Sequence, residues 1–107
     1  MLFVLSTVPV GERGEAIART LVDERLAACV NLYPPMTSVY RWRGAVERDE
    51  ERQLVIKTTG ALLAAVQARL LELHPYELPE ILILQPAAGS QPYLDWVAAS
   101  VGREPTA

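Results

Sequence analysis

The stretch TSVYRWRGAVERDEERQLVIKTT, residues 37–59, decides the fold. Its first part, Thr37 to Trp42, is rich in β-branched and aromatic residues, which favour a strand. Gly44 is the flexible position at which the chain must turn back, and Leu54 to Thr59 forms a second, mostly apolar strand. The stretch therefore predicts a long antiparallel β-hairpin. The charged residues between its apolar ends, 47–52, are expected to form a solvated face.

The segment before this hairpin predicts an interrupted edge strand. The run AACVNLY, residues 27–33, is typical of a strand, and it is followed at once by Pro34 and Pro35. Proline cannot donate a hydrogen bond to a sheet, so it is confined to edges and bulges. We expect this strand to lie at an edge and to be kinked at the two prolines.

The rest of the chain adds two strands and three helices. Residues 1–8 (MLFVLSTV) are apolar and rich in β-forming residues, as in a central strand. The other predicted elements are a helix marked by Ile17, Ala18, Leu21, Val22 and Leu26, a helix marked by Leu62, Leu63, Val66, Leu70 and Leu73, a last core strand over Ile81 to Leu84, and a short helix over Tyr93 to Val101.

The order of these elements, β-α-β-β-α-β-α, predicts an α+β fold of the ferredoxin-like βαββαβ type with a short C-terminal helix. A chain of 107 residues has room for one such domain, and we assign residues 1–101 to it and residues 102–107 to a flexible tail. Right-handed crossovers place both long helices on one face of a four-stranded sheet. The strands are apolar on both faces, so the uncovered face predicts association between copies of the chain.

Charge and composition exclude several classes of partner. The formal net charge is -3, and the nine arginines and the single lysine, Lys57, are dispersed, so a nucleic-acid interface is not expected. The apolar N-terminal run is too short to span a bilayer and lacks the features of a signal sequence, so no membrane role is expected. A single cysteine, Cys29, fits a reducing compartment, and we expect a cytoplasmic protein.

The polar segment HPYELPE, residues 74–80, is the densest candidate site. Two prolines stiffen it, so His74, Tyr76, Glu77 and Glu80 are displayed by a rigid loop. The alternative is local: His74 caps the preceding helix and the glutamates are simply solvated. Imidazole, thiolate and carboxylate donors together suit copper or zinc better than calcium or magnesium.

Other candidate residues have both structural and functional interpretations. Cys29 is either a packed core residue or a reactive thiol, and the sequence lacks the usual catalytic motifs. Tyr40 and Trp42 lie one strand period apart and therefore share a face, with Arg41 and Arg43 expected on the opposite face. We expect a binding protein and not an enzyme; an enzyme that uses Cys29 or His74 as its reactive group is the less favoured hypothesis.

Four segments together resemble one family, the divalent cation tolerance (CutA) proteins. The segments are ERLAACVN (24–31), TSVYRWRG (37–44), Lys57-Thr58 and HPYELPE (74–80), and the similarity extends from the first strand to about Val101. The resemblance implies a homotrimer around a threefold axis, similar in plan to the PII signalling proteins. It also implies a role in tolerance to copper and other divalent cations and, in animal members, in anchoring a membrane enzyme.

The same resemblance implies where a site would form. Six residues are expected to gather in clefts between subunits: Cys29, His74 and Glu77 as metal ligands, and Trp42, Lys57 and Tyr76 as ligand-binding residues. Copper or another divalent cation is the expected cofactor, and no organic cofactor is expected. Some bacterial members have further cysteines that this chain lacks, so a copper site built from several thiols is not carried over. The alternative function is a PII-like signalling module that binds an anionic metabolite and a partner protein.

Overall fold

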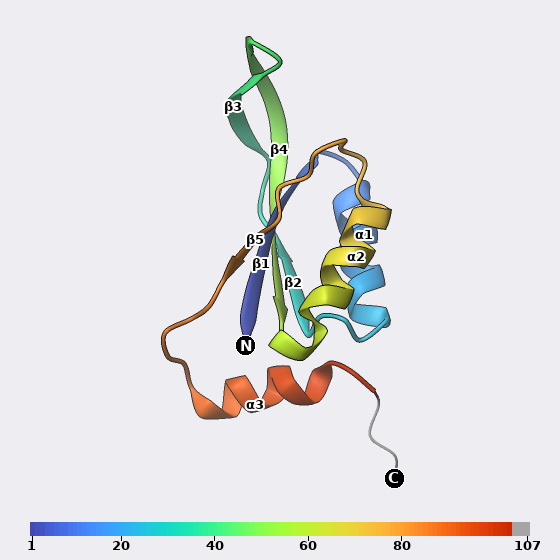
Figure 1. The fold of residues 1–107 in the computed structure, drawn as a ribbon, viewed down its shortest axis with the longest axis vertical. Coiled ribbons are helices and arrows are strands. Elements are labelled where there is room, and N and C mark those ends of the chain that lie inside the picture. The colour runs from blue at the N-terminus through green and yellow to red at the C-terminus, as the bar shows by residue number, and fades with distance from the viewer. Residues whose placement is uncertain (104–107) are drawn as a thin grey trace.

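The computed structural model describes residues 1–103 and contains an α+β arrangement, which confirms the predicted fold class (Figure 1). The strands are β1 (Leu2–Pro9), β2 (Cys29–Leu32), β3 (Met36–Trp42), β4 (Ala45–Thr58) and β5 (Leu82–Leu84). The helices are α1 (Arg13–Asp23), α2 (Leu63–Leu73), α3 (Gln91–Ser100) and a short 3-10 turn, η1 (Gly60–Leu62).

The sheet has five strands and not the expected four. Its order is β2-β4-β1-β5, and β3 pairs with the other end of β4. The additional strand arises because Pro34 and Pro35 divide one extended segment into β2 and β3. The two pieces pair with successive parts of β4, and every pairing in the sheet is antiparallel.

The predicted hairpin is present as β3 and β4. Trp42 pairs with Ala45 across a two-residue turn in which Arg43 and Gly44 have φ of 49° and 82°. Positive φ at both positions suits the twist of a tight hairpin. The placement of Arg43 on a strand face opposite Trp42 was wrong, because Arg43 lies in the turn. The hairpin projects beyond the body of the protein and helps to make its long axis 54 Å (Figure 1).

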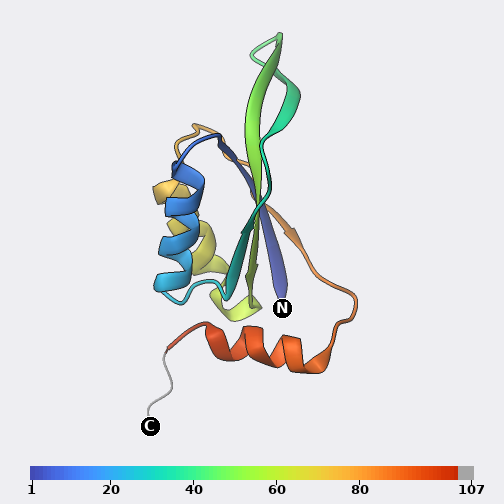
Figure 2. The same ribbon diagram turned by 180° about the vertical axis from the view of Figure 1, so that it is seen from behind.

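The hydrophobic core lies between the sheet and two helices. Figures 1 and 2 show α1 and α2 side by side on one face, as the right-handed crossovers predicted. Side chains alternate along a strand, so every second residue of β1 and β4 faces these helices. The fully or almost fully buried residues of this layer are Val4, Val8, Ile17, Leu21, Leu54, Ile56, Val66 and Leu70.

The opposite face of the sheet is apolar and open in the single chain. Phe3, Leu5 and Val55 lie on it and are only partly buried. On the neighbouring edge strand β5, Leu82 and Leu84 are 53% and 50% exposed. The predicted strand over Ile81 to Leu84 is present as β5, but its placement in the core was wrong for one chain, because β5 pairs only with β1 and its residues 82–84 are exposed. Helix α3 crosses one end of the sheet and leaves most of this face uncovered (Figure 2).

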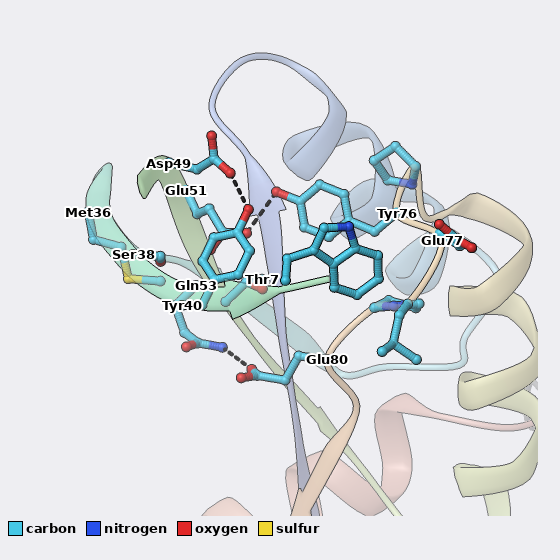
Figure 3. A pocket seen from close by; sticks show the side chains of 14 residues that line it. Thr7, Met36, Ser38, Tyr40, Asp49, Glu51, Gln53, Tyr76, Glu77 and Glu80 are labelled. Atoms are coloured by element: carbon cyan, nitrogen blue, oxygen red, sulfur yellow. Dashed lines mark hydrogen bonds between the residues drawn. The ribbon is translucent and has the colours of Figure 1, made fainter. Parts of the chain in front are cut away.

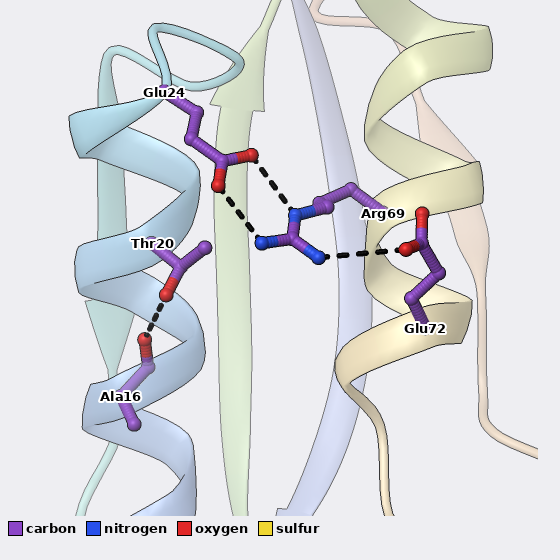
Figure 4. A network of polar contacts seen from close by, with 5 residues as sticks. All are labelled: Ala16, Thr20, Glu24, Arg69 and Glu72. Atoms are coloured by element: carbon purple, nitrogen blue, oxygen red, sulfur yellow. Dashed lines mark hydrogen bonds and ion pairs between the residues drawn. The ribbon is translucent and has the colours of Figure 1, made fainter.

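An ion-pair network joins the two core helices. Arg69 on α2 donates to both carboxylate oxygens of Glu24, just past the end of α1, at 2.9 Å each, and contacts Glu72 at 3.5 Å (Figure 4). The hydrogen bonds from Arg69 hold the pKa of Glu24 below its usual value. The bidentate geometry fixes the two helices relative to one another more specifically than a single contact would.

The first helix ends earlier than the apolar spacing indicated. α1 stops at Asp23, and Arg25 has a positive φ of 58°, so Leu26 lies beyond the helix although it packs against the core. The Arg25 carbonyl accepts from the Gly102 amide, and its guanidinium donates to the Gly102 carbonyl, both at 2.8 Å. These bonds hold Gly102, the first residue of the predicted tail, while residues 104–107 lie outside the described residues.

None of the helices in the described part of the chain is both long enough and apolar enough to cross a lipid bilayer.

Replacing Gly14 with alanine is predicted to destabilise the fold. A Cβ at this position would lie 2.8 Å from Cγ2 of Val8 and 3.1 Å from Cδ2 of Leu32. Alanine gains roughly 1 kcal/mol of helix propensity over glycine, but overpacking a core typically costs about 1–3 kcal/mol. We expect a net loss of up to about 2 kcal/mol in the free energy of unfolding, measured by chemical denaturation.

Gly60→Ala is the matched control, because a Cβ there meets nothing within 4 Å. Its stability should stay within about 0.5 kcal/mol of wild type. Equal stability of the two variants would contradict the close approach of α1 to β1.

Candidate functional site

A pocket of about 830 Å³ lies between the hairpin and the loop that follows α2 (Figure 3). The hairpin supplies one wall and residues 75–80 supply the other. The lining residues are Thr7, Met36, Ser38, Tyr40, Trp42, Asp49, Glu51, Gln53, Pro75, Tyr76, Glu77, Leu78, Pro79 and Glu80. A volume of this size falls in the usual range for small-molecule sites.

Strand alternation explains which hairpin residues face the pocket. Tyr40 and Trp42 both line it, which confirms that they share a face. On β4 the lining positions are 49, 51 and 53, every second residue of the strand. The strand is long enough to serve two purposes, because residues 54, 56 and 58 face the core while residues 49, 51 and 53 line the pocket.

Two tyrosine–carboxylate pairs occupy the pocket. The Tyr76 hydroxyl donates to Oε2 of Glu51 at 2.7 Å, and the Tyr40 hydroxyl donates to Asp49 (Figure 3). Burial and the bond to Glu51 raise the pKa of Tyr76, and the bond to Asp49 raises the pKa of Tyr40 to about 12. Both phenols therefore keep their protons at neutral pH and act as hydrogen-bond donors.

Glu77 is at the rim of the pocket and already has a partner. Its Oε2 accepts from the Arg43 guanidinium at 2.8 Å, and both side chains are about 70% exposed. The guanidinium carbon of Arg43 lies 5.2 Å from the centroid of the Trp42 ring. The turn of the hairpin is thus tied to the loop after α2 by one ion pair, while the cation–π contact with Trp42 holds Arg43 against its own hairpin.

His74 is a buried structural residue in the single chain. It is 8% exposed, its Nε2 lies 2.7 Å from the Thr7 carbonyl oxygen, and its Nδ1 accepts from the Tyr76 amide at 3.1 Å. Because the carbonyl can only accept and the amide can only donate, the partners select the neutral tautomer with hydrogen on Nε2. Neither nitrogen has a free lone pair for a metal ion in this arrangement.

Cys29 and Lys57 lie together at the other end of the sheet. They are paired in register across β2 and β4, and Lys57 Nζ lies 5.8 Å from the centroid of the Tyr93 ring on α3. The carbonyl oxygen of Thr7 accepts the hydrogen bond from His74, and Thr7 is paired in register with Gln53 of β4. Lys57 lies four positions along β4 from Gln53, so the two groups are about 13 Å apart along the strand.

One chain therefore brings together Trp42, Tyr76 and Glu77, with His74 adjacent, and keeps Cys29 and Lys57 apart from them. Within residues 1–103 there is no cluster of three or more histidine, cysteine, aspartate or glutamate side chains arranged to hold a metal ion. The six-residue site, in which the two groups would meet across a subunit boundary, stays a prediction.

Sequence reasoning missed Asp49 and Glu51 as pocket residues. The charged run 47–52 was expected to be solvated, yet Glu51 is only 8% exposed. A signal was available: residues 49 and 51 share the strand parity of 53, 55 and 57, opposite to the core positions 54, 56 and 58. The pocket forms only because β3 pairs Ser38 with Asp49 and Met36 with Glu51, and because the loop after α2 approaches this face.

An antiparallel sheet with two helices on one face and an open second face defines a ferredoxin-like α+β protein. The family model described as "CutA1 divalent ion tolerance protein" matches residues 2–100. The chain belongs to this CutA1 divalent ion tolerance family, as the sequence resemblance indicated. The family is named for tolerance and not for a chemical reaction.

Among its relatives is the divalent-cation tolerance protein CutA of Thermus thermophilus, 48% identical over 99 residues that cover 92% of this chain and 96% of that protein. Human protein CutA is 44% identical over 91 residues, 85% of this chain and 51% of the relative, so the chain spans about half of that longer protein.

Solved structures agree with this assignment. The Thermus thermophilus CutA1 structure superposes with a TM-score of 0.91 over 95% of this chain and 100% of that chain. A structure described as the PII-like protein CutA from Nostoc, 39% identical, has a TM-score of 0.90 over 95% and 98%. A PII-like ferredoxin-like fold is therefore supported by both sequence and structure.

The environment of His74 predicts a pH-dependent stability. Burial, opposed in part by the bond to Thr7, lowers the pKa of His74 below its ordinary value of 6.5. The unfolded chain then binds a proton near pH 6.5 while the folded chain does not. The contribution of His74 to the free energy of unfolding is therefore fully present above that pH. It is lost as pH falls from there toward the lower pKa of the folded state. We expect His74→Gln to be less stable at pH 7.5 but to lose less stability between pH 7.5 and 5 than wild type.

Chemical denaturation midpoints at pH 7.5, 6 and 5 measure this effect. Glu72→Gln serves as a control, because Glu72 is exposed on α2 and should leave the pH dependence attributable to His74 in place. A His74→Gln variant with the same pH slope as wild type would show that His74 titrates alike in the folded and unfolded chains.

Proposed function

We propose that this CutA1-family protein assembles as a homotrimer and acts in the tolerance of divalent metal ions, copper among them. It binds the ion or a small ligand in the clefts between subunits. The observation that carries the proposal is the open apolar face of the sheet, formed by Phe3, Leu5, Val55, Leu82 and Leu84. Apolar surface is stabilised by burial at about 25 cal/mol per Å². Two further copies of the chain, arranged around a threefold axis, are the proposed cover. The single cysteine favours the cytoplasm as the location.

The separation of the two residue groups supports a site shared between subunits. Cys29 and Lys57 lie on the open face, about 13 Å along β4 from the position that His74 contacts. A ligand that contacts all of the proposed residues therefore requires groups from two chains. In this proposal Cys29, His74 and Glu77 are the metal ligands, and Trp42, Lys57 and Tyr76 form the wall of the cleft.

The donor chemistry favours copper over harder ions. A thiolate and an imidazole are soft or borderline ligands, which prefer copper and zinc to magnesium and calcium. Binding through His74 requires that this residue release the Tyr76 amide at Nδ1 or the Thr7 carbonyl at Nε2. Glu77 is exposed and can exchange its ion pair with Arg43 for a metal contact at small cost.

A PII-like signalling role is the second candidate. Its support is the resemblance to the Nostoc structure described as PII-like and the position of Lys57, which makes no ion pair with any residue of the described chain. In this role Lys57 attracts an anionic metabolite at the open face, and the complex docks on a partner protein.

Placing a charge on the open face tests the trimer. Leu5→Glu would bury a carboxylate in an apolar seam, at a cost of several kcal/mol per subunit. We expect wild type to sediment with three times the chain mass of 11.8 kDa and Leu5→Glu to dissociate. Leu71→Glu is the control, because Leu71 is 56% exposed on α2 and lies in the opposite layer, so its mass should be unchanged. A wild-type monomer in dilute solution would sink the proposal.

Titration calorimetry separates the two functions. We expect saturable Cu²⁺ binding to wild type, with an affinity at least tenfold weaker in Cys29→Ser, since the softest donor is removed. His74→Gln should weaken binding as well. A nucleoside triphosphate without metal should then give no saturable heat. The PII-like alternative requires the reverse: binding of the nucleotide that is lost in Lys57→Gln and Cu²⁺ titrations that are indifferent to Cys29→Ser.

A further inference from the structure

The charged run of the hairpin, residues 47–52, separates its charges onto two faces. Neighbouring residues of a strand point in opposite directions, so the odd-numbered positions of this run share the face that carries the pocket. These positions are Glu47, Asp49 and Glu51. Arg48 and Arg52 therefore point to the other face. The alternation of acidic and basic residues along β4 makes one face of the hairpin acidic and the opposite face basic.

Strand β3 adds a third arginine to the second face. The residues of β3 that line the pocket are even-numbered, so Val39 and Arg41 point away from it. The register pairs Val39 with Arg48 and Arg41 with Val46. The two strands therefore present a square in which valine and arginine alternate. These four residues are called the basic face of the hairpin.

Nothing in the described chain covers the basic face. Helices α1 and α2 cover the body of the sheet, and the hairpin projects beyond them (Figures 1 and 2). Val39 and Val46 are accordingly 66% and 65% exposed. Because these valines are diagonal neighbours on one strand face, they form a small apolar patch and not a set of scattered residues.

The arginines of this face have weak internal partners. Arg41 and Arg48 each make one long hydrogen bond to a neutral acceptor within the hairpin, at 3.5 and 3.4 Å. Within residues 1–103 the ion pair of Arg48 is with Glu50, at 3.9 Å, and both side chains are more than half exposed. Arg52 differs, because its Nε donates to the Tyr33 carbonyl oxygen at 2.7 Å. The guanidinium groups of Arg41 and Arg48 are therefore available to an anion that approaches the hairpin.

The spacing of these two arginines fits an extended acidic segment. Arg41 pairs with Val46, two residues before Arg48, so the arginines are diagonal neighbours across the strands. Diagonal side chains lie about 7–8 Å apart. Side chains two residues apart in an extended chain are spaced by about 7 Å. Carboxylates at alternate positions of such a segment can therefore reach both guanidinium groups at once, with their methylene groups against the valines.

Larger polyanions fit the basic face less well. A nucleic acid or an anionic bilayer presents a long, uniform negative field, whereas this chain has a formal net charge of -3. The opposite face of the same narrow hairpin is acidic as well. A short segment supplies the two carboxylates without bringing further negative charge against that acidic face.

We propose that the basic face of the hairpin is a docking site for an extended acidic segment of another protein. Positions 46 and 48 share the strand parity of the core positions 54 and 56, so this face lies on the helix side of the sheet. Assembly through the opposite, open face leaves it accessible. The inference uses none of the residues of the proposed metal site, so neither proposal depends on the other.

The test is fluorescence anisotropy on the full chain at low salt, with a labelled hexapeptide of alternating glutamate and serine as the probe. We expect saturable binding, at least about tenfold weaker for a peptide with glutamine in place of glutamate. A variant that combines Arg41→Gln with Arg48→Gln should bind the acidic peptide at least about tenfold more weakly, because both charge-assisted hydrogen bonds are lost. Glu50→Gln should bind it about twofold more tightly, since a like charge is removed from the same face.

Arg19→Gln is the matched control, because Arg19 is an exposed arginine on α1, away from the hairpin. Its affinity should stay within about twofold of wild type. Three outcomes overturn the proposal: no saturable binding of the acidic peptide, equal binding of the glutamine peptide, or an affinity that the double variant lowers no more than Arg19→Gln does. Arginine-dependent binding to vesicles that contain phosphatidylserine, without binding of the peptide, would assign the face to a membrane surface and overturn it as well.

Discussion

The pairing of β1 with β4 is the constraint on which the rest of the structure depends. Its register places Val4, Leu54 and Ile56 on the face covered by α1 and α2. The same register necessarily places Leu5 and Val55 on the other face, because neighbouring residues of a strand point in opposite directions. The same strand pairing thus produces both the buried core of the chain and the apolar surface that its own helices leave uncovered.

The length of β4 connects this framework to the candidate site. The strand has 14 residues, and its C-terminal part pairs with both β1 and β2, while its N-terminal part pairs with β3. The body of the protein thereby fixes the direction of the hairpin. The loop after α2 is fixed in turn by the bond between His74 and Thr7 and by the bond between Tyr76 and Glu51. The pocket lies where these two rigid elements meet, which suits binding because little ordering is needed when a ligand enters.

Parts of the fold and the site were predictable because they depend on local periodicity. The apolar spacing from Ile17 to Leu21 and from Val66 to Leu70 identified both core helices, and the prolines at 34 and 35 identified the interruption between β2 and β3. Tyr40 and Trp42 were correctly placed on one face. The errors arose where the outcome depends on distant partners: the exposure of β5, the burial of Glu51 and the return of Arg43 over Trp42. Each of these is set by contacts between residues far apart in the chain or by a turn geometry.

The sequence by itself determined the order of the elements, the faces of the helices and strands, and the family, because these follow from short-range spacing and from motifs read in sequence. Only the tertiary structure decided what each polar group contacts. His74 has both nitrogens occupied, Glu51 is buried beside a neutral phenol, and Cys29 is separated from both along β4. The physical reason is that periodicity fixes the side of an element on which a residue lies. Hydrogen bonding and charge compensation depend on which other element is brought to that side.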